Sequence, residues 1–327
     1  MNLRIDSLFS TRRRLGLVLT LLCGLIAGPA LAQTRTELRI GYQKYGTLTI
    51  LKARGDLEKR LAPQGVDVRW TEFPAGPQLL EGLNVGSIDF GTVGEAPPIF
   101  AQVAGADLVY VANQPPAPAG EAIVVGKDSP IRSVAELKGR KVALNKGSNV
   151  HYLLVKALEK AGVRYSEIQP VFLAPADARA AFERGSVDAW VIWDPFLAAA
   201  EKQLGARVLA DGKGLVANHQ FYLASRPYAD KQPQVIRAIV EELARLDRWA
   251  EGNSREVAAF LAPQIGLDPG VAEAAAGRFA YGIVPITPTV AAQQQKIADV
   301  FFELKLIPKA IRIADALPTS LKTASTR

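Results

Sequence analysis

The pattern of apolar and polar positions switches repeatedly between the period of a strand and the period of a helix. Short apolar or alternating runs, such as Leu38–Tyr42 and Ile88–Val93, predict strands. Longer stretches with apolar residues every three or four positions, such as Ile50–Leu61 and Asn149–Ala161, predict helices. Regular alternation of this kind favours mostly parallel sheets flanked by helices. The pattern therefore predicts an α/β protein.

One segment of this pattern occurs twice. Gly86–Ala96 aligns without a gap on Gly185–Pro195, and a helix is predicted before each copy. Upstream, the strands Leu38–Tyr42 and Lys141–Leu144 also correspond, in the same order. In open α/β sheets, ligands bind beyond the carboxyl ends of the strands. The repeat therefore predicts two similar lobes that face each other across a ligand cleft.

The N-terminal segment, residues 1–32, has the composition of an export signal. Arg12–Arg14 is basic, Leu15–Ala27 is an apolar run too short to span a bilayer, and Ala30–Ala32 has the small residues of a cleavage site. The general secretory route is favoured over a twin-arginine route. We therefore predict a cleaved signal peptide and an exported protein.

The order of the remaining elements predicts that the chain crosses between the lobes twice. Lobe 1 is expected to comprise residues 33–125 and 226–327, and lobe 2 residues 126–225. The proline-rich loop Asn113–Pro118 is too short for a flexible linker, so we place it near the hinge or at the rim of the cleft.

Composition excludes several classes of function. The one cysteine, Cys23, lies in the signal segment, so disulfides, cysteine catalysis and thiolate metal sites are excluded. The net charge of the whole chain is +7, but the basic residues are scattered and aromatic residues do not interleave with them. No nucleic-acid partner is expected. The two histidines, His151 and His219, have no nearby carboxylate at metal-site spacing, and we predict no metal or other cofactor.

Small or hydroxyl residues stand where predicted strands give way to helices. A helix start presents unpaired N–H groups and the positive end of the helix dipole, which suits the oxygens of a sulfonate, sulfate, nitrate or phosphate. Ordinary helix capping is the alternative for any single turn, but matched places in two lobes favour binding. The predicted anion-binding turns are Gly46-Thr47, Gly94-Glu95-Ala96 and Gly147-Ser148-Asn149.

Trp193-Asp194-Pro195-Phe196 ends the strand of the second copy. We predict that Trp193 faces the cleft because it falls at the end of the strand, and that Trp190 lies in the core; the alternative places both in the core. Trp193 and Phe196 are expected to line an apolar slot for an alkyl or aryl tail. Asp194 is expected to cap the following turn or to clamp the lobes.

Glu95 conflicts with an anion site, because a carboxylate beside a bound anion lowers its affinity. Four alternatives resolve the conflict: the side chain is turned away, it is protonated, it is paired with Lys44 or Lys146, or the ligand also carries an amine.

His151 lies one turn into the helix that follows Ser148, and we predict that it donates to the ligand. The combination Ser148, His151 and Asp194 also suggests a catalytic triad. Ser148 is not in a nucleophile-elbow sequence, so we expect a protein that is not an enzyme.

Seven short strings, in this order, closely resemble the periplasmic aliphatic sulfonate-binding proteins of ABC importers. The resemblance extends over nearly the whole chain after residue 32. It implies a type II periplasmic binding protein, here expected to be a monomer. Such a protein delivers its ligand, a sulfur source, to a membrane permease driven by a cytoplasmic ATPase. The strings are Tyr42-Gln43-Lys44, Glu72–Gln78, Leu83–Asp89, Ala96–Gln102, Lys146-Gly147-Ser148, Pro175–Phe182 and Trp193-Asp194-Pro195.

The resemblance also implies where the sulfonate head lies: among the loops that match Gln43 to Thr47, Gly94 to Ala96, Gly147 to Asn149, and Trp193-Asp194. A related sequence has Gln-Lys-Gly-Ser at the first loop, so Tyr45 is an addition that narrows the slot or stacks on a tail. Taurine, nitrate, a thiamin-precursor pyrimidine, an aromatic sulfonate or a sulfate ester stay open as ligands, as does a secreted hydrolase.

Overall fold

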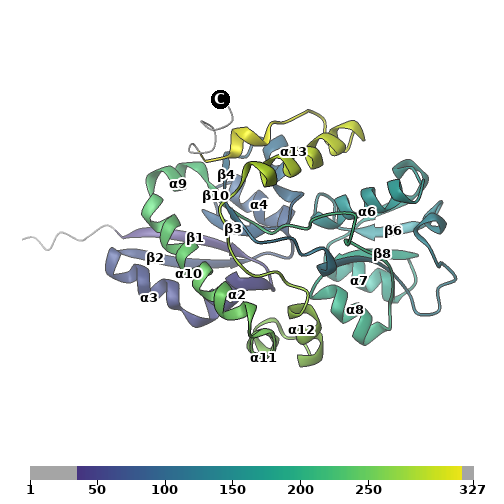
Figure 1. Cartoon of the computed structure of the whole chain (residues 1–327), viewed down its shortest axis with the longest axis horizontal. Coiled ribbons are helices and arrows are strands. Elements are labelled where there is room, and N and C mark those ends of the chain that lie inside the picture. Colours follow the sequence, from purple (N-terminus) through teal and green to yellow (C-terminus); the bar gives the residue numbers. More distant parts are fainter. Residues whose placement is uncertain (1–34, 319–327) are drawn as a thin grey trace, which may run out of the picture. The chain divides into compact units, whose positions relative to one another are not determined.

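A computed structural model describes residues 35–318 (Figure 1). The chain divides into two units, Met1–Thr36 and Glu37–Arg327, and the architecture below is that of the second unit. The predicted signal peptide, residues 1–32, lies outside the described residues.

Two five-stranded sheets with the same pattern of strands form the framework (Figure 1). The first has the order β2-β1-β3-β10-β4 and the second β7-β6-β8-β5-β9. In each sheet two strands of the repeat, β1 and β3 or β6 and β8, pair in parallel. The strands are β1 Thr36–Tyr42, β2 Val66–Glu72, β3 Phe90–Val93, β4 Leu108–Asn113, β5 Glu121–Val125, β6 Lys141–Leu144, β7 Gln169–Phe172, β8 Ala189–Trp193, β9 Arg207–Asp211 and β10 Phe221–Ser225.

The fourth strand of each sheet comes from the other half of the chain and is antiparallel to both of its neighbours. β5 pairs with β8 and β9, and β10 pairs with β3 and β4. In terms of sheet membership, the predicted boundaries at residues 125 and 225 therefore fall one strand too late. The apolar pattern identifies β5 and β10 as strands, but the pattern contains no information on which sheet each strand joins.

The two copies of the repeat make the same local contacts. The Asp89 carboxylate accepts the Arg39 N–H at 2.9 Å, and the Asp188 carboxylate accepts the Lys141 N–H at 2.8 Å. The N–H of each aspartate donates back to the carbonyl of the same partner, at 2.7 and 2.8 Å. Each aspartate thus fixes a parallel pair of strands at its start, which confirms the repeat predicted from the sequence.

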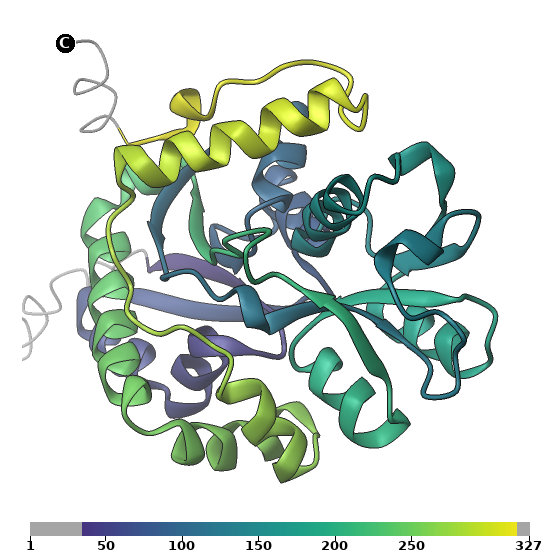
Figure 2. The ribbon, with the colours of Figure 1, turned by 45° about the vertical axis from the view of Figure 1, so that its right-hand side comes forward.

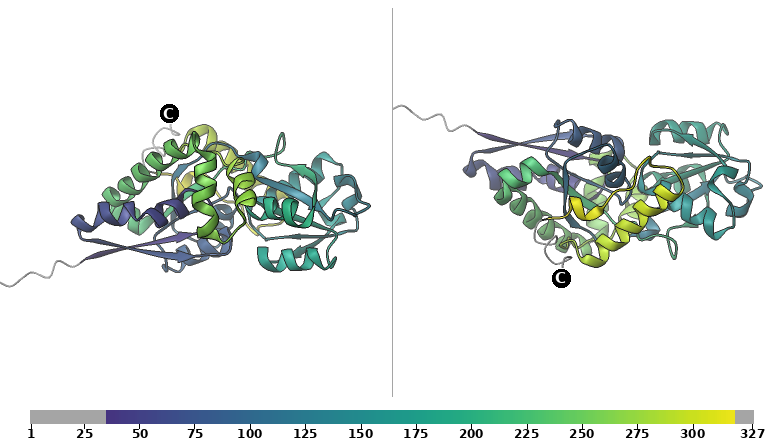
Figure 3. Two further views of the ribbon diagram at one scale, coloured as in Figure 1. Left: turned by 90° about the horizontal axis from the view of Figure 1, so that it is seen from below. Right: turned by 90° about the horizontal axis from the view of Figure 1, so that it is seen from above.

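Helices cover both sheets (Figure 3). The first sheet packs on one face against α2, α3, α10 and α11, and on the other against α4, α5 and α13. The second sheet forms one core with α6, α7 and α8. The helices are α2 Gly46–Arg54, α3 Asp56–Leu61, α4 Gly76–Asn84, α5 Pro97–Val103, α6 Asn149–Lys160, α7 Pro175–Glu183, α8 Phe196–Leu204, α9 Arg226–Lys231, α10 Pro233–Glu251, α11 Ser254–Ile265, α12 Pro269–Ala276 and α13 Pro288–Glu303.

The predicted helix Ile50–Leu61 is wrong in one respect, because it is interrupted. Gly55 takes φ 64°, the left-handed conformation that ends α2, and α3 begins at the next residue. This break lets α3 change direction and meet α10.

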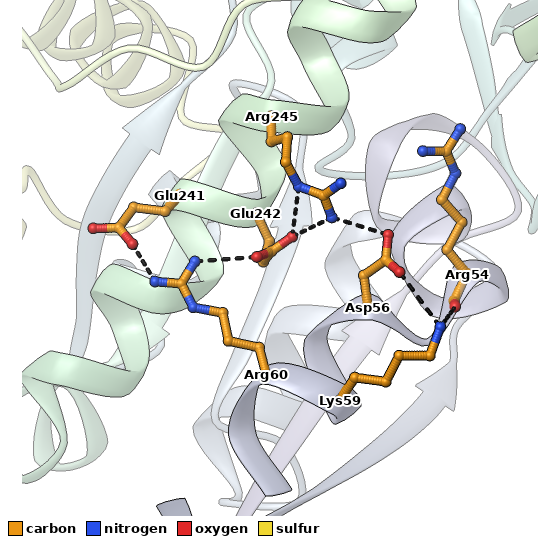
Figure 4. A network of polar contacts seen from close by, with 7 residues as sticks. All are labelled: Arg54, Asp56, Lys59, Arg60, Glu241, Glu242 and Arg245. Atoms are coloured by element: carbon orange, nitrogen blue, oxygen red, sulfur yellow. Dashed lines mark hydrogen bonds and ion pairs between the residues drawn. The ribbon is translucent and has the colours of Figure 1, made fainter. Parts of the chain in front are cut away.

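A network of charged side chains joins α3 to α10 (Figure 4). Arg60 contacts Glu242 at 3.1 Å, and Arg245 bridges Glu242 and Asp56, the latter at 2.9 Å. Because most of these side chains are partly exposed, each pair contributes little by itself, about 0–1 kcal/mol. The network orients α10, which carries a residue of the candidate site described next.

Candidate functional site

A cavity of about 40 Å³ lies where the two sheets meet, at the carboxyl ends of β1 and β8; we call it the α2 cavity. On this measure a water needs roughly 10–15 Å³, so the space suits a few waters or the oxygens of a small anion. The described residues that line it include no lysine or arginine. They are Tyr45, Gly46, Thr47, Gln114, Pro115, Ala117, Gly120, Asn149, Trp193, Asp194, Asn218, Gln220, Phe279, Ala280 and Tyr281.

Two helices begin at the α2 cavity. Gly46 and Thr47 are the first residues of α2, and Asn149 is the first residue of α6. Neither helix has a side-chain cap or an acidic residue in its first turn. Their first N–H groups and their dipoles therefore favour an anion, without a charged side chain.

A buried aspartate on α10 orients the first-lobe side of the cavity. Asp247 is fully buried and accepts the Thr47 hydroxyl at 2.5 Å and the Gln114 amide at 2.9 Å. It also accepts the Gly282 N–H at 3.0 Å. Burial raises the pKa of Asp247, and these donors oppose the rise. Three segments that lie far apart in the sequence are thereby held in one geometry.

Aromatic side chains from both lobes wall the cavity. The Tyr45 hydroxyl donates to the Gln220 side-chain oxygen at 2.8 Å, and its ring lies 6.2 Å from that of Phe279. On the opposite side, Trp193 packs edge-on against Phe196 at 6.1 Å. Trp193 lines the α2 cavity, whereas Phe196, expected to line the same slot, is not among the lining residues. The walls thus offer an apolar surface beside the two helix starts.

Asp194 caps a helix, one of the two roles expected from the sequence, and also contacts the segment after α12. Its carboxylate accepts the Ala198 N–H of α8 at 3.0 Å and contacts the Arg278 guanidinium at 3.4 Å. Arg278, which follows α12, also reaches Glu201. Burial raises the pKa of Asp194 to about 7, although Arg278 opposes the rise.

Gly94 allows the two lobes to touch. A Cβ at this position would lie 2.8 Å from the Cβ of Asn149, so only glycine fits there without movement. The Asn149 amide donates to Glu121 and to the Asn218 side-chain oxygen, the latter at 3.0 Å. Glu121 is the first residue of β5, opposite Trp193. Gly94 therefore lies at the contact rather than at the wall of the α2 cavity.

Glu95 does not line the α2 cavity but a second one of about 330 Å³, which we call the α13 cavity. Its Oε2 accepts the His219 N–H at 3.2 Å, while its Oε1 is buried without a hydrogen-bond partner. Burial raises the pKa of Glu95 to about 7. The pairing with a lysine considered from the sequence does not form: Lys44 contacts Glu72 at 3.3 Å, and Lys146 lies over the ring of Phe172.

His151 lies in an aromatic cluster outside the residues that line either cavity. Its ring nitrogens contact the Gly147 N–H at 3.2 Å and the Tyr165 hydroxyl at 2.9 Å, and its ring faces Phe100 and Phe301. Burial lowers the pKa of His151 to about 4. The described contacts thus place this imidazole as a neutral packing group rather than a donor to a cleft ligand.

The suggested catalytic triad is not assembled. The Ser148 hydroxyl donates to the Asn145 carbonyl at 2.7 Å, whereas both nitrogens of His151 have the partners given above. Asp194 belongs to the α8 and Arg278 contacts. Ser148 and His151 share only a backbone hydrogen bond of the helix start, and no described side-chain contact links any two of the three residues.

The remaining predicted site residues shape the turns. Gln43 donates from its amide to the Thr92 carbonyl at 3.1 Å and is buried. Ala96 is fully buried before α5, and Gly147 takes φ 76° against the ring of Phe100. These residues position the loops without lining the α2 cavity.

Sequence reasoning missed several residues of the site: Gln220, Asn218, Phe279, Tyr281 and Asp247. Asp247 left a signal, because it falls on the apolar stripe of α10 next to Leu246, where a charged residue is unusual. The others lie in irregular segments, whose positions follow from the packing of the sheets.

Within residues 35–318, no group of three or more histidine, cysteine, aspartate or glutamate side chains is placed to hold a metal ion. No helix in this range has the length and apolar character needed to cross a bilayer.

Two sheets with exchanged strands and a cavity at the carboxyl ends of their parallel strands define the two-lobed fold of periplasmic binding proteins. The chain belongs to the NMT1/THI5-like family, whose model matches residues 61–249.

Three relatives illustrate the likeness. A putative aliphatic sulfonates-binding protein of Escherichia coli K12 is 49% identical over 87% of this chain and 90% of its own length. The structure of the alkanesulfonate-binding protein SsuA from Xanthomonas axonopodis pv. citri bound to MOPS has a TM-score of 0.84, with 42% identity over 88% of this chain and 99% of that one. The periplasmic aliphatic sulphonate binding protein SsuA of E. coli has a TM-score of 0.78, with 48% identity, covering 86% and 92%.

Proposed function

We propose that this protein captures aliphatic sulfonates as the substrate-binding component of an ABC importer. The observation that carries the proposal is the α2 cavity, where the starts of α2 and α6 meet beside an aromatic wall. The sulfonate oxygens accept from the first N–H groups of the two helices, and Thr47, whose hydroxyl donates to Asp247, holds the start of α2 in place. Tyr45 and Trp193 contact the alkyl tail.

Absence of a basic lining side chain among the described residues suits a singly charged sulfonate better than a doubly charged sulfate. Neutral donors bind a monoanion in a dry site without the desolvation of a counter-ion. The lobes close on the ligand by hinge motion at the two segments that join the sheets, residues 114–120 and 212–220. Asp194 does not oppose the anion, because its carboxylate is directed to the start of α8 and to Arg278.

The wider setting of the proposal follows from the family. The protein acts in the periplasm as a monomer after removal of residues 1–32, and delivers its ligand to a membrane permease with a cytoplasmic ATPase. It binds without catalysing a reaction. Support for this last point comes from Ser148 and His151, whose hydrogen bonds leave neither side chain activated by the other.

The first test measures the thermal midpoint of the purified protein with methane-, ethane-, butane- and hexanesulfonate, and with taurine, nitrate, sulfate and a thiamin-precursor pyrimidine. A ligand at about 100 times its dissociation constant adds about 2.7 kcal/mol, which moves the midpoint by several degrees. We expect shifts with alkanesulfonates and none with sulfate or nitrate. The same samples are assayed for released sulfite, and none is expected.

A variant pair locates the site. Thr47→Val removes the hydroxyl at the start of α2, and Thr71→Val makes the same change at an exposed position of β2. We expect about tenfold weaker butanesulfonate binding for the first, because losing the bond from Thr47 to the Asp247 carboxylate, worth about 1.5–3 kcal/mol, releases the start of α2 from the geometry that holds the sulfonate. The second variant is expected to bind butanesulfonate as the unmodified protein does. Equal binding by both variants places the sulfonate elsewhere, and released sulfite refutes the absence of catalysis.

A further inference from the structure

The α13 cavity has the size and walls of a binding site. Its volume of about 330 Å³ is within the range of small-molecule pockets, roughly 300–1,000 Å³. Residues of α13, of the segment before β10 and of α6 line it, the last through Tyr152. Figure 2 shows α13 as the long yellow helix at the top of the view. Leu215, Val216 and Ile297 give it apolar surface, and Glu95 is a buried charge-bearing group at its wall.

Glu95 has unused hydrogen-bonding capacity. The residue is 1% exposed, its carboxylate is met by the backbone N–H groups of His219 and Asn218, and its Oε1 has no hydrogen-bond partner. A buried carboxylate without a counter-charge is costly, and such groups are normally paired or protonated. Lys296, on α13, lines the same cavity, but no ion pair joins it to Glu95 among the described residues. The neighbouring carboxylate, Glu121, is also buried with one unpartnered oxygen.

We propose that the α13 cavity binds an ammonium group, with Glu95 as its counter-ion. The N–H groups of the ammonium satisfy Oε1, and its positive charge offsets the two buried carboxylates. Tyr152 and the aliphatic walls accept a short carbon chain attached to the nitrogen. The chemical class is therefore a primary alkylammonium of a few carbons.

Two sources supply such a group. Asn218 lines the α2 cavity and its neighbour His219 lines the α13 cavity, so the two cavities flank one short segment. The ammonium belongs either to a separate amine or to the far end of an aminosulfonate whose sulfonate lies in the α2 cavity. The second source rests on the proposed function, and the first does not.

The test titrates the purified protein with n-butylammonium chloride at pH 8 by calorimetry, with n-butanol and sodium chloride as controls. We expect one bound butylammonium per chain and no binding of butanol. Glu95→Gln keeps the shape and removes the charge, and we expect at least tenfold weaker binding. Glu81→Gln removes a charge from an exposed position of α4 and is expected to leave binding unchanged.

A second variant tests the cavity without altering the charge. Val290→Phe, on α13, fills the α13 cavity, and we expect it to abolish butylammonium binding while butanesulfonate still binds. No butylammonium binding by the unmodified protein, or equal binding by Glu95→Gln, overturns the proposal and leaves Glu95 as a neutral structural carboxyl.

The last arm separates the two sources. It compares 3-aminopropanesulfonate with propanesulfonate. If one molecule spans both cavities, the aminosulfonate binds more tightly, and Glu95→Gln lowers it to the level of propanesulfonate. If the sources are separate, butylammonium and propanesulfonate bind together; both results support an ammonium at Glu95. A failure of all sulfonates to bind refutes the proposed function, whereas the butylammonium titration still tests the ammonium site by itself.

Discussion

Glu95 and Asp194 stand at the same position of the two copies of the repeat, and burial raises the pKa of each to about 7. Their surroundings differ. Asp194 caps α8 and contacts Arg278, whereas Glu95 meets only backbone N–H groups, those of His219 and Asn218, and keeps an unpartnered oxygen. The same strand-to-helix turn thus holds a structural carboxylate in the second copy. In the first copy it holds a carboxylate with an oxygen that accepts no hydrogen bond.

The largest effect on stability is expected from a variant that removes the unpaired charge of Glu95. At pH 8 Glu95→Gln is expected to stabilise the protein by roughly 3 kcal/mol, because a folded-state pKa near 7 against an unfolded value of 4.5 disfavours the charged form. Because the folded state holds the proton of Glu95 more tightly than the unfolded state does, the contribution of Glu95 to the free energy of unfolding falls as the pH rises from about 4.5 to 7. At pH 5 the gain falls below about 1 kcal/mol.

Chemical denaturation of both proteins at pH 5 and pH 8 in amine-free buffer measures this difference. Using the variant minus the unmodified protein cancels other titrating groups, such as His151. A gain that is the same at both pH values contradicts the assignment of Glu95 as a buried, unpaired carboxylate.

The second-largest effect is expected at Gly94, the residue before Glu95. Gly94 corresponds to Trp193 in the alignment, and the first must be small where the second forms a wall. Gly94→Val forces Asn149 away, and overpacking of this kind costs about 1–3 kcal/mol. If closure bears that cost, butanesulfonate binding weakens by about 10- to 100-fold.

Calorimetry measures the affinity of Gly94→Val, and its unfolding midpoint without ligand is the control. Gly105→Val is the matched control. A Cβ at residue 105 meets open space, but the residue has a positive φ of 90°, so the variant is expected to lower stability without changing ligand binding. Unchanged affinity for Gly94→Val means that the lobes need not touch at residue 94 to hold the ligand.

Removing the counter-charge of Asp194 tests the other half of the comparison. Arg278→Met is expected to cost about 1–2 kcal/mol at pH 8, where Asp194 is largely charged, and less at pH 5, where it holds a proton. The figure is modest because Arg278 is partly exposed to solvent. Thermal denaturation at the two pH values measures it, and a loss independent of pH indicates that Arg278 acts through packing alone.

The smallest effect concerns the two aspartates that fix the strand pairs. Asp89 bonds the Arg39 side chain as well as its N–H, whereas Asp188 lies 3.8 Å from Arg140. Asp188→Ala is expected to cost about 1 kcal/mol, and Asp89→Ala about 2 kcal/mol, since charge-assisted hydrogen bonds contribute more. Urea denaturation of both variants measures the two losses of stability. A larger loss for Asp188→Ala than for Asp89→Ala contradicts the view that Asp89 plays the role of Asp188 and gains a further bond to the Arg39 side chain.

Part of the site followed from sequence because it is local. Tyr45, Thr47, Asn149 and Trp193 all lie where a strand ends and a helix begins, and the apolar pattern locates such places. His151 lies in the same kind of place, but its side chain points into an aromatic cluster. The pattern gives the position of a residue along an element, whereas the direction of its side chain depends on what packs against it.

The sequence by itself determined the α/β class, the repeat, the two facing sheets and the turns that meet between them, because periodicity and turn chemistry are local properties of the chain. Only the tertiary structure decided which strands exchange between the sheets, that Asp247 holds Thr47 across 200 residues of sequence, and that Arg278 contacts Asp194. These contacts join segments whose separation no local pattern records, so they exist only once the sheets have packed.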